Sequence, residues 1–190
     1  MAISLKKGQK VDLTKGNPGL SKLLIGLGWD TNKYDGGSDF DLDASAFLLG
    51  PNEKVTSDAD FVFYGNLKHP SGAIVHTGDN LTGEGEGDDE QILVDLTAVP
   101  ADYDKLVFVV NIYDCESRKQ DFGMIANAFI RICDERTGEE FCRYNLSESY
   151  AGMTAMIFGE IYRYNGEWKF NAIGQGTKDK GLNELARRYQ

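Results

Sequence analysis

The sequence predicts an all-β fold: an antiparallel β-sandwich with acidic loops and a short C-terminal helix. Three observations favour this fold class. Short apolar segments recur along the chain, with turn residues about every 8–12 positions, as is typical of sandwiches. The composition includes 22 glycines and 11% aromatic residues, which suits strands joined by many turns. Only residues 182–189 (LNELARRY) have a helical pattern.

The predicted strands begin with residues 3–14, which alternate weakly. Residues 23–29 (LLIGLGW) are a short apolar run that is typical of a strand buried on both faces, and Gly26 and Gly28 disfavour a helix there. The other predicted strands are residues 40–49, 61–64, 73–76, 91–96, 106–113, 123–133, 140–146, 154–164 and 168–172. An Asn-Gly pair separates the last two strands and predicts a tight hairpin.

Residues 1–190 are predicted to form a single domain, because no repeat or low-complexity linker interrupts them. The net charge of −10 disfavours nucleic acid and anionic membranes as direct partners. No apolar run reaches the roughly 20 residues of a membrane span, so direct membrane insertion is not expected. No signal peptide is visible, and the three cysteines show no disulfide or zinc spacing. We therefore expect a cytoplasmic protein with reduced cysteines.

The most informative segment is residues 76–91 (HTGDNLTGEGEGDDEQ), which hold six acidic residues, four glycines and no basic residue. Two unit charges about 4 Å apart repel by roughly 1 kcal/mol even in water. A hard divalent cation relieves such repulsion, and Ca²⁺ takes roughly 6–8 oxygen ligands. The alternation of acid and glycine between two predicted strands favours a Ca²⁺ loop. The alternative is a solvated acidic turn.

A second acidic cluster starts the predicted strand at residues 40–49. Asp39, Asp41 and Asp43 share one face of an extended chain, because the side-chain period of a strand is two. We expect these carboxylates to meet a cation at the end of the strand. An exposed polar face is the alternative. Asp114 and Asn127 are further candidates, either as ligands or as turn and backbone-pairing residues.

Other kinds of site fit less well. Neither acidic cluster follows the spacing of an EF-hand, and GEGEG has no P-loop lysine after it. No GxSxG elbow accompanies His69 or His76, and His76 is expected to orient the acidic loop. The alternative function is a Mg²⁺- or Mn²⁺-dependent enzyme acting on a phosphate-containing substrate. The lack of Lys or Arg within the acidic segment disfavours it.

Several motifs of this chain occur together in a known family. They are GLGWD (26–30), DFDLDASAFLL (39–49), HTGDNLTGEGEGDDEQI (76–92), the series NIYD (111–114), FG (122–123) and NAFIRI (127–132), and EWKFNAIGQG (167–176).

With these motifs, nearly the whole chain resembles the TerD family of bacterial tellurium-resistance and general-stress proteins. The resemblance implies a β-sandwich that binds two Ca²⁺ ions at adjacent loops and has no catalytic activity. It also implies resistance to tellurite and other chemical stress, through association with other Ter-family proteins in a membrane-associated complex. Carried over to this sequence, the implied metal ligands are Asp39, Asp41, Asp43, Asp79, Asn80, Asp88, Asp89 and Glu90, with carbonyls of Gly83, Gly85 or Gly87.

Overall fold

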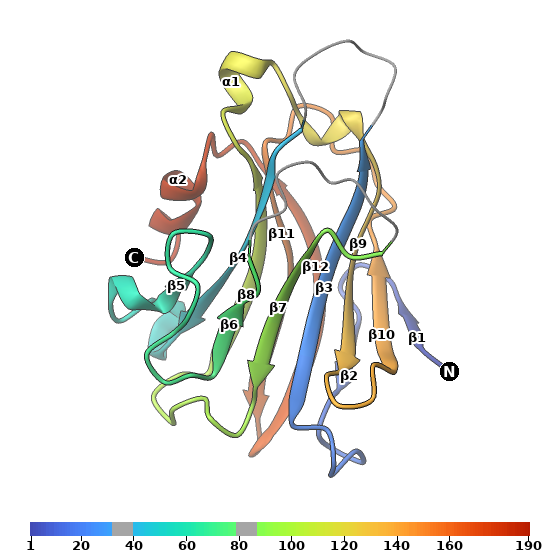
Figure 1. Ribbon diagram of the computed structural model, residues 1–190, viewed down its shortest axis with the longest axis vertical. Helices are drawn as coiled ribbons and strands as arrows, with labels where there is room; N and C mark the ends of the chain where they lie inside the picture. Colours follow the sequence, from blue (N-terminus) through green and yellow to red (C-terminus); the bar gives the residue numbers. More distant parts are fainter. Residues whose placement is uncertain (32–39, 79–86) are drawn as a thin grey trace.

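The computed structural model describes residues 1–31, 40–78 and 87–190, and it consists of two stacked six-stranded sheets (Figure 1). In spatial order, the first sheet contains β1 (Ile3–Leu5), β10 (Glu140–Asn145), β9 (Ile125–Asp134), β3 (Lys22–Thr31), β7 (Glu90–Asp95) and β6 (Ile74–His76). The second contains β2 (Lys10–Asp12), β12 (Glu167–Thr177), β11 (Ala155–Tyr164), β8 (Lys105–Ile112), β4 (Leu42–Leu49) and β5 (Phe61–Val62). Neighbouring strands are antiparallel except β1 and β10, so the predicted antiparallel sandwich is confirmed.

Alternating side chains build the core between the sheets. On β3, Leu23, Ile25 and Leu27 are fully buried in this core. Gly26 and Gly28, which alternate with them along the strand, face outward. On β4, Leu42, Ala44 and Leu48 enter the same core from the opposite sheet. Each strand therefore has one face in the sandwich and one face left for other contacts.

A second apolar cluster covers the outer face of the second sheet. The C-terminal helix α2 (Leu182–Arg187) contributes Leu185 and Ala186, which pack with Phe47 of β4 and Val109 of β8. Figure 1 shows α2 beside these strands, away from the first sheet. The predicted C-terminal helix is confirmed, and its apolar face is buried against the sheet.

The predicted first strand, residues 3–14, is wrong as one element. Gln9 N–H donates to Lys6 O at 2.9 Å, and Gly8 has a φ of 79°, a left-handed value that glycine adopts readily. This turn moves the chain from one sheet to the other. β1 therefore pairs with β10, and β2 pairs with β12.

The structure also contains short helices that the sequence pattern did not indicate. They are α1 (Cys115–Arg118) and the 3-10 helices η1 (Pro51–Glu53), η2 (Asp58–Asp60) and η3 (Phe122–Met124). Each is at most four residues long, too short to show a helical period. Because of η3, strand β9 starts at Ile125 and not at residue 123 as predicted.

The last strand is longer than predicted. β12 continues to Thr177 through Gly174 and Gly176, residues that usually indicate the end of a strand. A Cβ at Gly174 would lie 2.0 Å from the Tyr144 hydroxyl, so glycine is required there by a close tertiary contact. The predicted hairpin between β11 and β12 is confirmed, with φ values of 50° at Asn165 and 78° at Gly166.

Candidate metal centre

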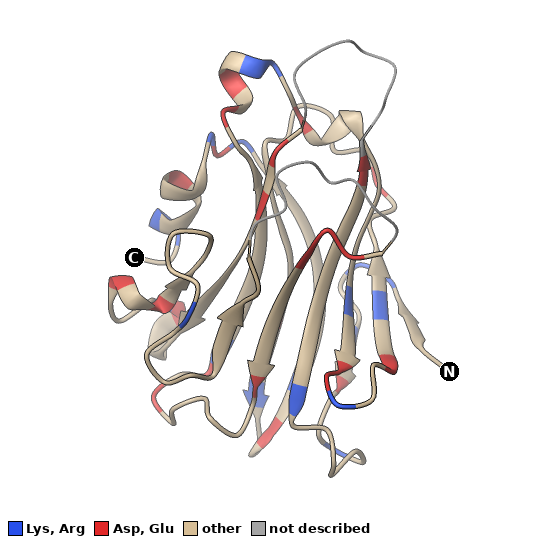
Figure 2. Ribbon diagram, in the orientation of Figure 1, with Lys and Arg blue, Asp and Glu red and all other residues tan. Residues whose placement is uncertain are grey.

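Carboxylates gather where β3 ends and where β4 and β7 begin (Figure 2). Six of the predicted metal-site residues lie in the described parts of the chain: Asp41, Asp43, Gly87, Asp88, Asp89 and Glu90. The other five, Asp39, Asp79, Asn80, Gly83 and Gly85, lie outside the described residues. The structure therefore places part of the predicted ligand set.

Two outward-facing glycines of β3 let the segment before β7 lie directly on the first sheet. A Cβ at Gly26 would fall 2.3–2.4 Å from the carboxylate atoms of Asp88. A Cβ at Gly28 would fall 2.8 Å from the Gly87 carbonyl oxygen and 2.4 Å from the Phe129 ring. Gly87 itself has a φ of 112°, which side chains rarely tolerate. The glycines of the GLGW segment therefore make room for the acidic segment.

Asp88 forms a bidentate ion pair with Arg131 of β9. Arg131 Nε donates to Asp88 Oδ1 at 2.7 Å, and Nη2 donates to Oδ2 at 2.8 Å. Gln91 Nε2 also donates to Asp88 Oδ2 at 3.0 Å, and only 1% of the Asp88 side chain is exposed. The hydrogen bonds from the guanidinium to Asp88, above all other causes, raise the pKa of Arg131. The sequence showed no basic residue in this segment, but the fold brings one to it.

Asp89 has a carboxyl whose pKa is shifted by burial and by neighbouring charges. Its Oδ2 accepts a hydrogen bond from Trp29 N at 2.7 Å, which favours the ionised carboxylate. Burial nevertheless raises the pKa of Asp89 to about 6, and the charges of Asp30 and Asp88 act in the same direction. Asp30 lies at the end of β3, where its Oδ2 accepts from Asn127 Nδ2 at 2.7 Å. Asn127, a candidate ligand in the sequence, is thus a hydrogen-bond donor to Asp30.

Glu90 enters the sandwich itself. It is 2% exposed, and its Oε2 accepts from Ala44 N at 2.6 Å, so it ties the start of β7 to β4. His76 Nε2 lies 3.3 Å from the same oxygen and 3.1 Å from Ala44 O. The expected link between His76 and the acidic segment is therefore present, through Glu90.

Asp43 lies on the opposite surface of the second sheet from Glu90. Leu42 and Ala44 on either side belong to the inter-sheet core, so Asp43 points to the outer face, where it is 4% exposed. Its β8 neighbour in register is Asn111. Asp41 precedes β4, and its carbonyl accepts from Tyr113 N at 2.8 Å. Asp43 and Glu90, one from each acidic motif, are thus separated by the second sheet.

The described residues bring Asp88 and Asp89 together beside Asp30, but they leave Asp43 and Glu90 on other surfaces. Within residues 1–31, 40–78 and 87–190, no group of three or more His, Cys, Asp or Glu side chains is arranged to hold a metal ion. The donors present are hard oxygens, which fit Ca²⁺ in chemistry. A complete ligand shell would need donors from outside these ranges.

A second polar network resembles a nucleophile–base–acid set. Ser71 N–H donates to His69 Nδ1 at 3.1 Å, which makes Nδ1 the acceptor, and Ser71 Oγ lies 2.6 Å from the same nitrogen. His69 Nε2 faces Asp60 Oδ1 at 3.2 Å. Ser71 Oγ also accepts from Ala73 N at 3.1 Å, so the hydroxyl closes the turn between β5 and β6. We interpret this network as a structural one that stabilises the turn.

Asp60 at the centre of this network should stabilise the fold in a pH-dependent way. Burial favours the neutral acid, but hydrogen bonds from Tyr103 Oη, Thr56 and Ser57 outweigh it and hold the pKa of Asp60 below 3.8. The carboxylate therefore contributes stability above that value, and the contribution is lost as the pH falls through the folded-state pKa. We expect Asp60→Asn to lower the free energy of unfolding by about 2 kcal/mol at pH 7.

Urea unfolding of both proteins at pH 7 and pH 3 checks this prediction. The difference in stability between wild type and Asp60→Asn should shrink at pH 3. A difference that stays constant with pH would contradict a charged Asp60 at the centre of the network.

No helix in the part of the chain that the structure describes is both long and apolar enough to cross a membrane.

Comparison with known proteins identifies the family. A model of the TerD domain matches residues 1–189. General stress protein 16U of Bacillus subtilis (strain 168) is 60% identical over 189 residues, covering 100% of this chain and 97% of that protein. Tellurium resistance protein TerD of Serratia marcescens is 53% identical, with the same coverage of 100% and 97%.

Solved structures share the fold. The crystal structure of SAV2460, a protein of unknown function, has a TM-score of 0.71 at 26% identity and covers 88% of this chain and 95% of its own. A homologue of telluride resistance protein from Streptomyces coelicolor A3(2) has a TM-score of 0.66 at 20% identity, with coverage of 85% and 92%. From the match over residues 1–189 and these close relatives, the chain belongs to the TerD domain family.

Proposed function

We propose that this protein is a non-enzymatic, calcium-binding stress-response protein that contributes to resistance against tellurite and other chemical stress. The stress role is supported by relatives at 53–60% identity whose names describe tellurium resistance and general stress. The calcium role is supported chiefly by one observation, the position of the half-buried Asp89 carboxyl beside the carboxylates of Asp30 and Asp88: burial raises its pKa to about 6, and the two neighbouring charges act in the same direction. A bound cation would relieve this crowding and favour the ionised carboxylates.

We assign the ligands to the predicted acidic set. Asp41, Asp43, Asp89 and Glu90 would act together with donors outside the described residues, namely Asp39, Asp79, Asn80 and the carbonyls of Gly83 and Gly85. Two ions suit this assignment, because the second sheet separates Asp43 on its outer face from Glu90 on its inner face. When bound, Ca²⁺ would neutralise the carboxylates and cross-link the loops that carry them.

Asp88 has a different part in this proposal. Its oxygens accept hydrogen bonds from Arg131 and Gln91, so it would become a ligand only by exchanging the guanidinium for the ion. As long as the ion pair persists, Asp88 orients the segment that leads to Asp89. Gly87, whose carbonyl lies over Gly28, has the same positioning role.

The alternative, a Mg²⁺- or Mn²⁺-dependent enzyme acting on a phosphate-containing substrate, gains a basic residue from the structure. Arg131 lies beside the carboxylates, although it is absent from the acidic segment of the sequence. Its donors, however, are engaged by Asp88 and by Glu140 Oε2 at 3.3 Å. A guanidinium held by two carboxylates is a poor phosphate ligand, so we favour the non-enzymatic role.

We further propose that Ca²⁺ binding controls association with other Ter-family proteins, within a cytoplasmic, membrane-associated complex. An ordered, neutralised loop surface is better suited to a protein partner than a set of repelling carboxylates. Binding of the partner with equal affinity in chelator and in Ca²⁺ would contradict this control.

Calorimetric titration of chelator-treated protein with Ca²⁺ tests the central proposal. We expect about two ions to bind in a background of about 1 mM Mg²⁺, because Mg²⁺ rarely accepts all-protein carboxylate cages. At free Ca²⁺ about 100 times the dissociation constant, stability should rise by about 2.7 kcal/mol. For a chain of this size the melting temperature should rise by about 5–10 °C.

Asp89→Asn and Asp102→Asn form a matched pair for this titration. Asp102 is exposed in the turn before β8, at the opposite end of that strand from the acidic loops, so its substitution should leave Ca²⁺ binding unchanged. Asp89→Asn should weaken binding. A titration without heat and a melt without a shift would reject calcium binding.

A further inference from the structure

The outer face of the first sheet carries a row of apolar side chains. Val75 of β6, Leu93 of β7 and Leu24 of β3 are direct neighbours in register, and Cys133 of β9 is the neighbour of Leu24 on its other side. These residues alternate with core residues along their strands, so they point outward, and they belong to neither apolar cluster. The three aliphatic side chains are partly exposed. The solvent face of an antiparallel sheet is normally polar, so this row is unusual.

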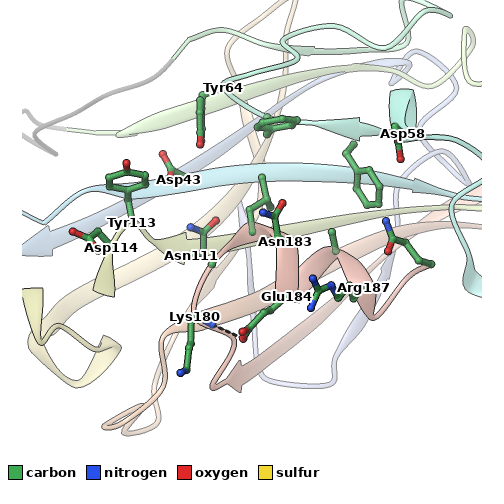
Figure 3. Close-up of a pocket in the computed structure, with 16 residues that line it drawn as sticks. Asp43, Asp58, Tyr64, Asn111, Tyr113, Asp114, Lys180, Asn183, Glu184 and Arg187 are labelled. Atoms are coloured by element: carbon green, nitrogen blue, oxygen red, sulfur yellow. Dashed lines mark hydrogen bonds between the residues drawn. The ribbon is translucent and has the colours of Figure 1, made fainter. Parts of the chain in front are cut away.

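The two sheets differ in what covers their outer faces. The helix α2 lies over the second sheet, where Asn183 and Arg187 line a groove beside it (Figure 3). On the first sheet, residues 87 and 88 cover the part over Gly28 and Gly26. Figure 1 looks onto this sheet and shows no described helix over the middle of β6, β7 and β3. Within the described parts of the chain, the apolar row therefore has no helix or strand packed on it.

Two opposite charges lie next to the row, on the side away from the acidic loops. Lys22 and Asp95 are register partners on β3 and β7, two residues from Leu24 and Leu93 and on the same face. Neither forms an ion pair with another described residue. Asp95 Oδ1 accepts hydrogen bonds from Thr97 in the turn that follows β7. Both charges are therefore available to a second molecule.

These neighbouring pairs are self-complementary about one axis. The axis is a two-fold that lies between β3 and β7 and runs parallel to them. In two copies packed face to face about it, β3 of each copy lies over β7 of the other. Leu24 then faces Leu93 of the second copy, and Lys22 faces Asp95 of the second copy. Each contact occurs twice, as in any isologous interface, so the arrangement buries the row and pairs both charges.

We propose that two copies of this chain associate through the outer faces of their first sheets and form a symmetric dimer. Burial of the apolar row favours association, and the contacts between Lys22 and Asp95 fix how the two sheets are aligned. Three partly exposed aliphatic side chains per copy make a small interface, and two copies of net charge −10 repel each other. The dimer is therefore weak, with a dissociation constant on the order of 0.1 mM.

Sedimentation velocity of the full chain tests the proposal between about 0.01 and 1 mM protein, at about 0.15 M salt to screen the net charge. The experiment is done in calcium chelator, so that its outcome is independent of calcium binding. We expect the average mass to rise toward that of a dimer, and amide shifts over the same dilution series to map to residues 22–26, 73–77 and 91–95. A monomer throughout this range would overturn the proposal, as would shifts confined to another surface.

Leu93→Lys and Met124→Lys form a matched pair of variants. Leu93→Lys places a charge in the middle of the row and should weaken dimerisation at least about tenfold, because the charge loses water in the interface. Met124 is 36% exposed in η3, beyond the opposite end of β9 from Cys133, so Met124→Lys should leave dimerisation unchanged. Thermal melts confirm that both variants are folded. Dimerisation of Leu93→Lys equal to that of the wild type would contradict the interface.

Charge reversal tests the two-fold arrangement itself. Lys22→Glu places carboxylates opposite each other in the dimer, and Asp95→Lys places ammonium groups opposite each other. Each variant alone should therefore dimerise about tenfold more weakly than the wild type. An equimolar mixture of the two variants restores both contacts between opposite charges and should associate as well as the wild type. A mixture that associates no better than the separate variants would reject the arrangement.

Discussion

Replacing Arg131 with glutamine should lower the free energy of unfolding by about 3 kcal/mol, a large effect for one side chain. The physical reason is that its partner, the Asp88 carboxylate, is buried. Only 1% of the Asp88 side chain is exposed, and two of its three hydrogen bonds from side chains come from the Arg131 guanidinium. The variant leaves a buried carboxylate with Gln91 as its remaining side-chain donor. Urea unfolding in calcium chelator measures the loss.

Arg136→Gln is the matched control. Arg136 also pairs with an aspartate, Asp134, but its side chain is 52% exposed. Water replaces such a contact readily, so a much smaller loss is expected there. The double variant Asp88→Asn/Arg131→Gln should recover part of the stability, because the stranded charge is gone. Equal losses of stability from the Arg131 and Arg136 substitutions would show that the buried ion pair contributes no more to stability than the exposed one.

Gly26→Ala should destabilise the protein by about 2 kcal/mol although it adds a single methyl group. The new Cβ would lie 2.3 Å from Asp88 Oδ1, so the carboxylate must move away from the sheet and from Arg131. In an ordinary strand position, the same substitution is favourable because glycine is the more flexible residue in the unfolded chain. The sign of the effect thus reports how closely the acidic segment lies on β3.

Gly19→Ala is the control for Gly26→Ala. Its Cβ would meet only Arg136 Nη2, at an ordinary 3.5 Å. Thermal melts of the two variants should therefore differ clearly, with the lower melting temperature for Gly26→Ala. If Gly26→Ala melts at or above the wild-type temperature, the segment before β7 does not rest on β3.

The two substitutions act on one contact, so their effects should not add. Arg131→Gln removes the partner of Asp88, and Gly26→Ala displaces Asp88 from that partner. The double variant should lose less stability than the sum of the single losses. This coupling would distinguish loss of the ion pair from general damage to the sheet.

Local sequence patterns were enough to predict the fold class and the outline of the elements. The apolar run at residues 23–29 predicted a buried strand, and the structure buries Leu23, Ile25 and Leu27 of that strand between the sheets. The Asn-Gly hairpin and the C-terminal helix could also be predicted, because both depend on residues close together in the chain. The acidic motifs identified the region of the candidate metal centre for the same reason.

The side chains that meet in this region could not be predicted in the same way. Arg131 is 43 residues from Asp88 in the sequence, and nothing local to β9 indicates its partner. Asp43 and Glu90 both belong to acidic motifs, yet alternation along β4 and β7 sends them to opposite faces of the second sheet. The two-residue period of a strand predicts which side chains share a face. The pairing of strands distant in sequence decides what that face contacts, since non-local contacts depend on the whole packed chain.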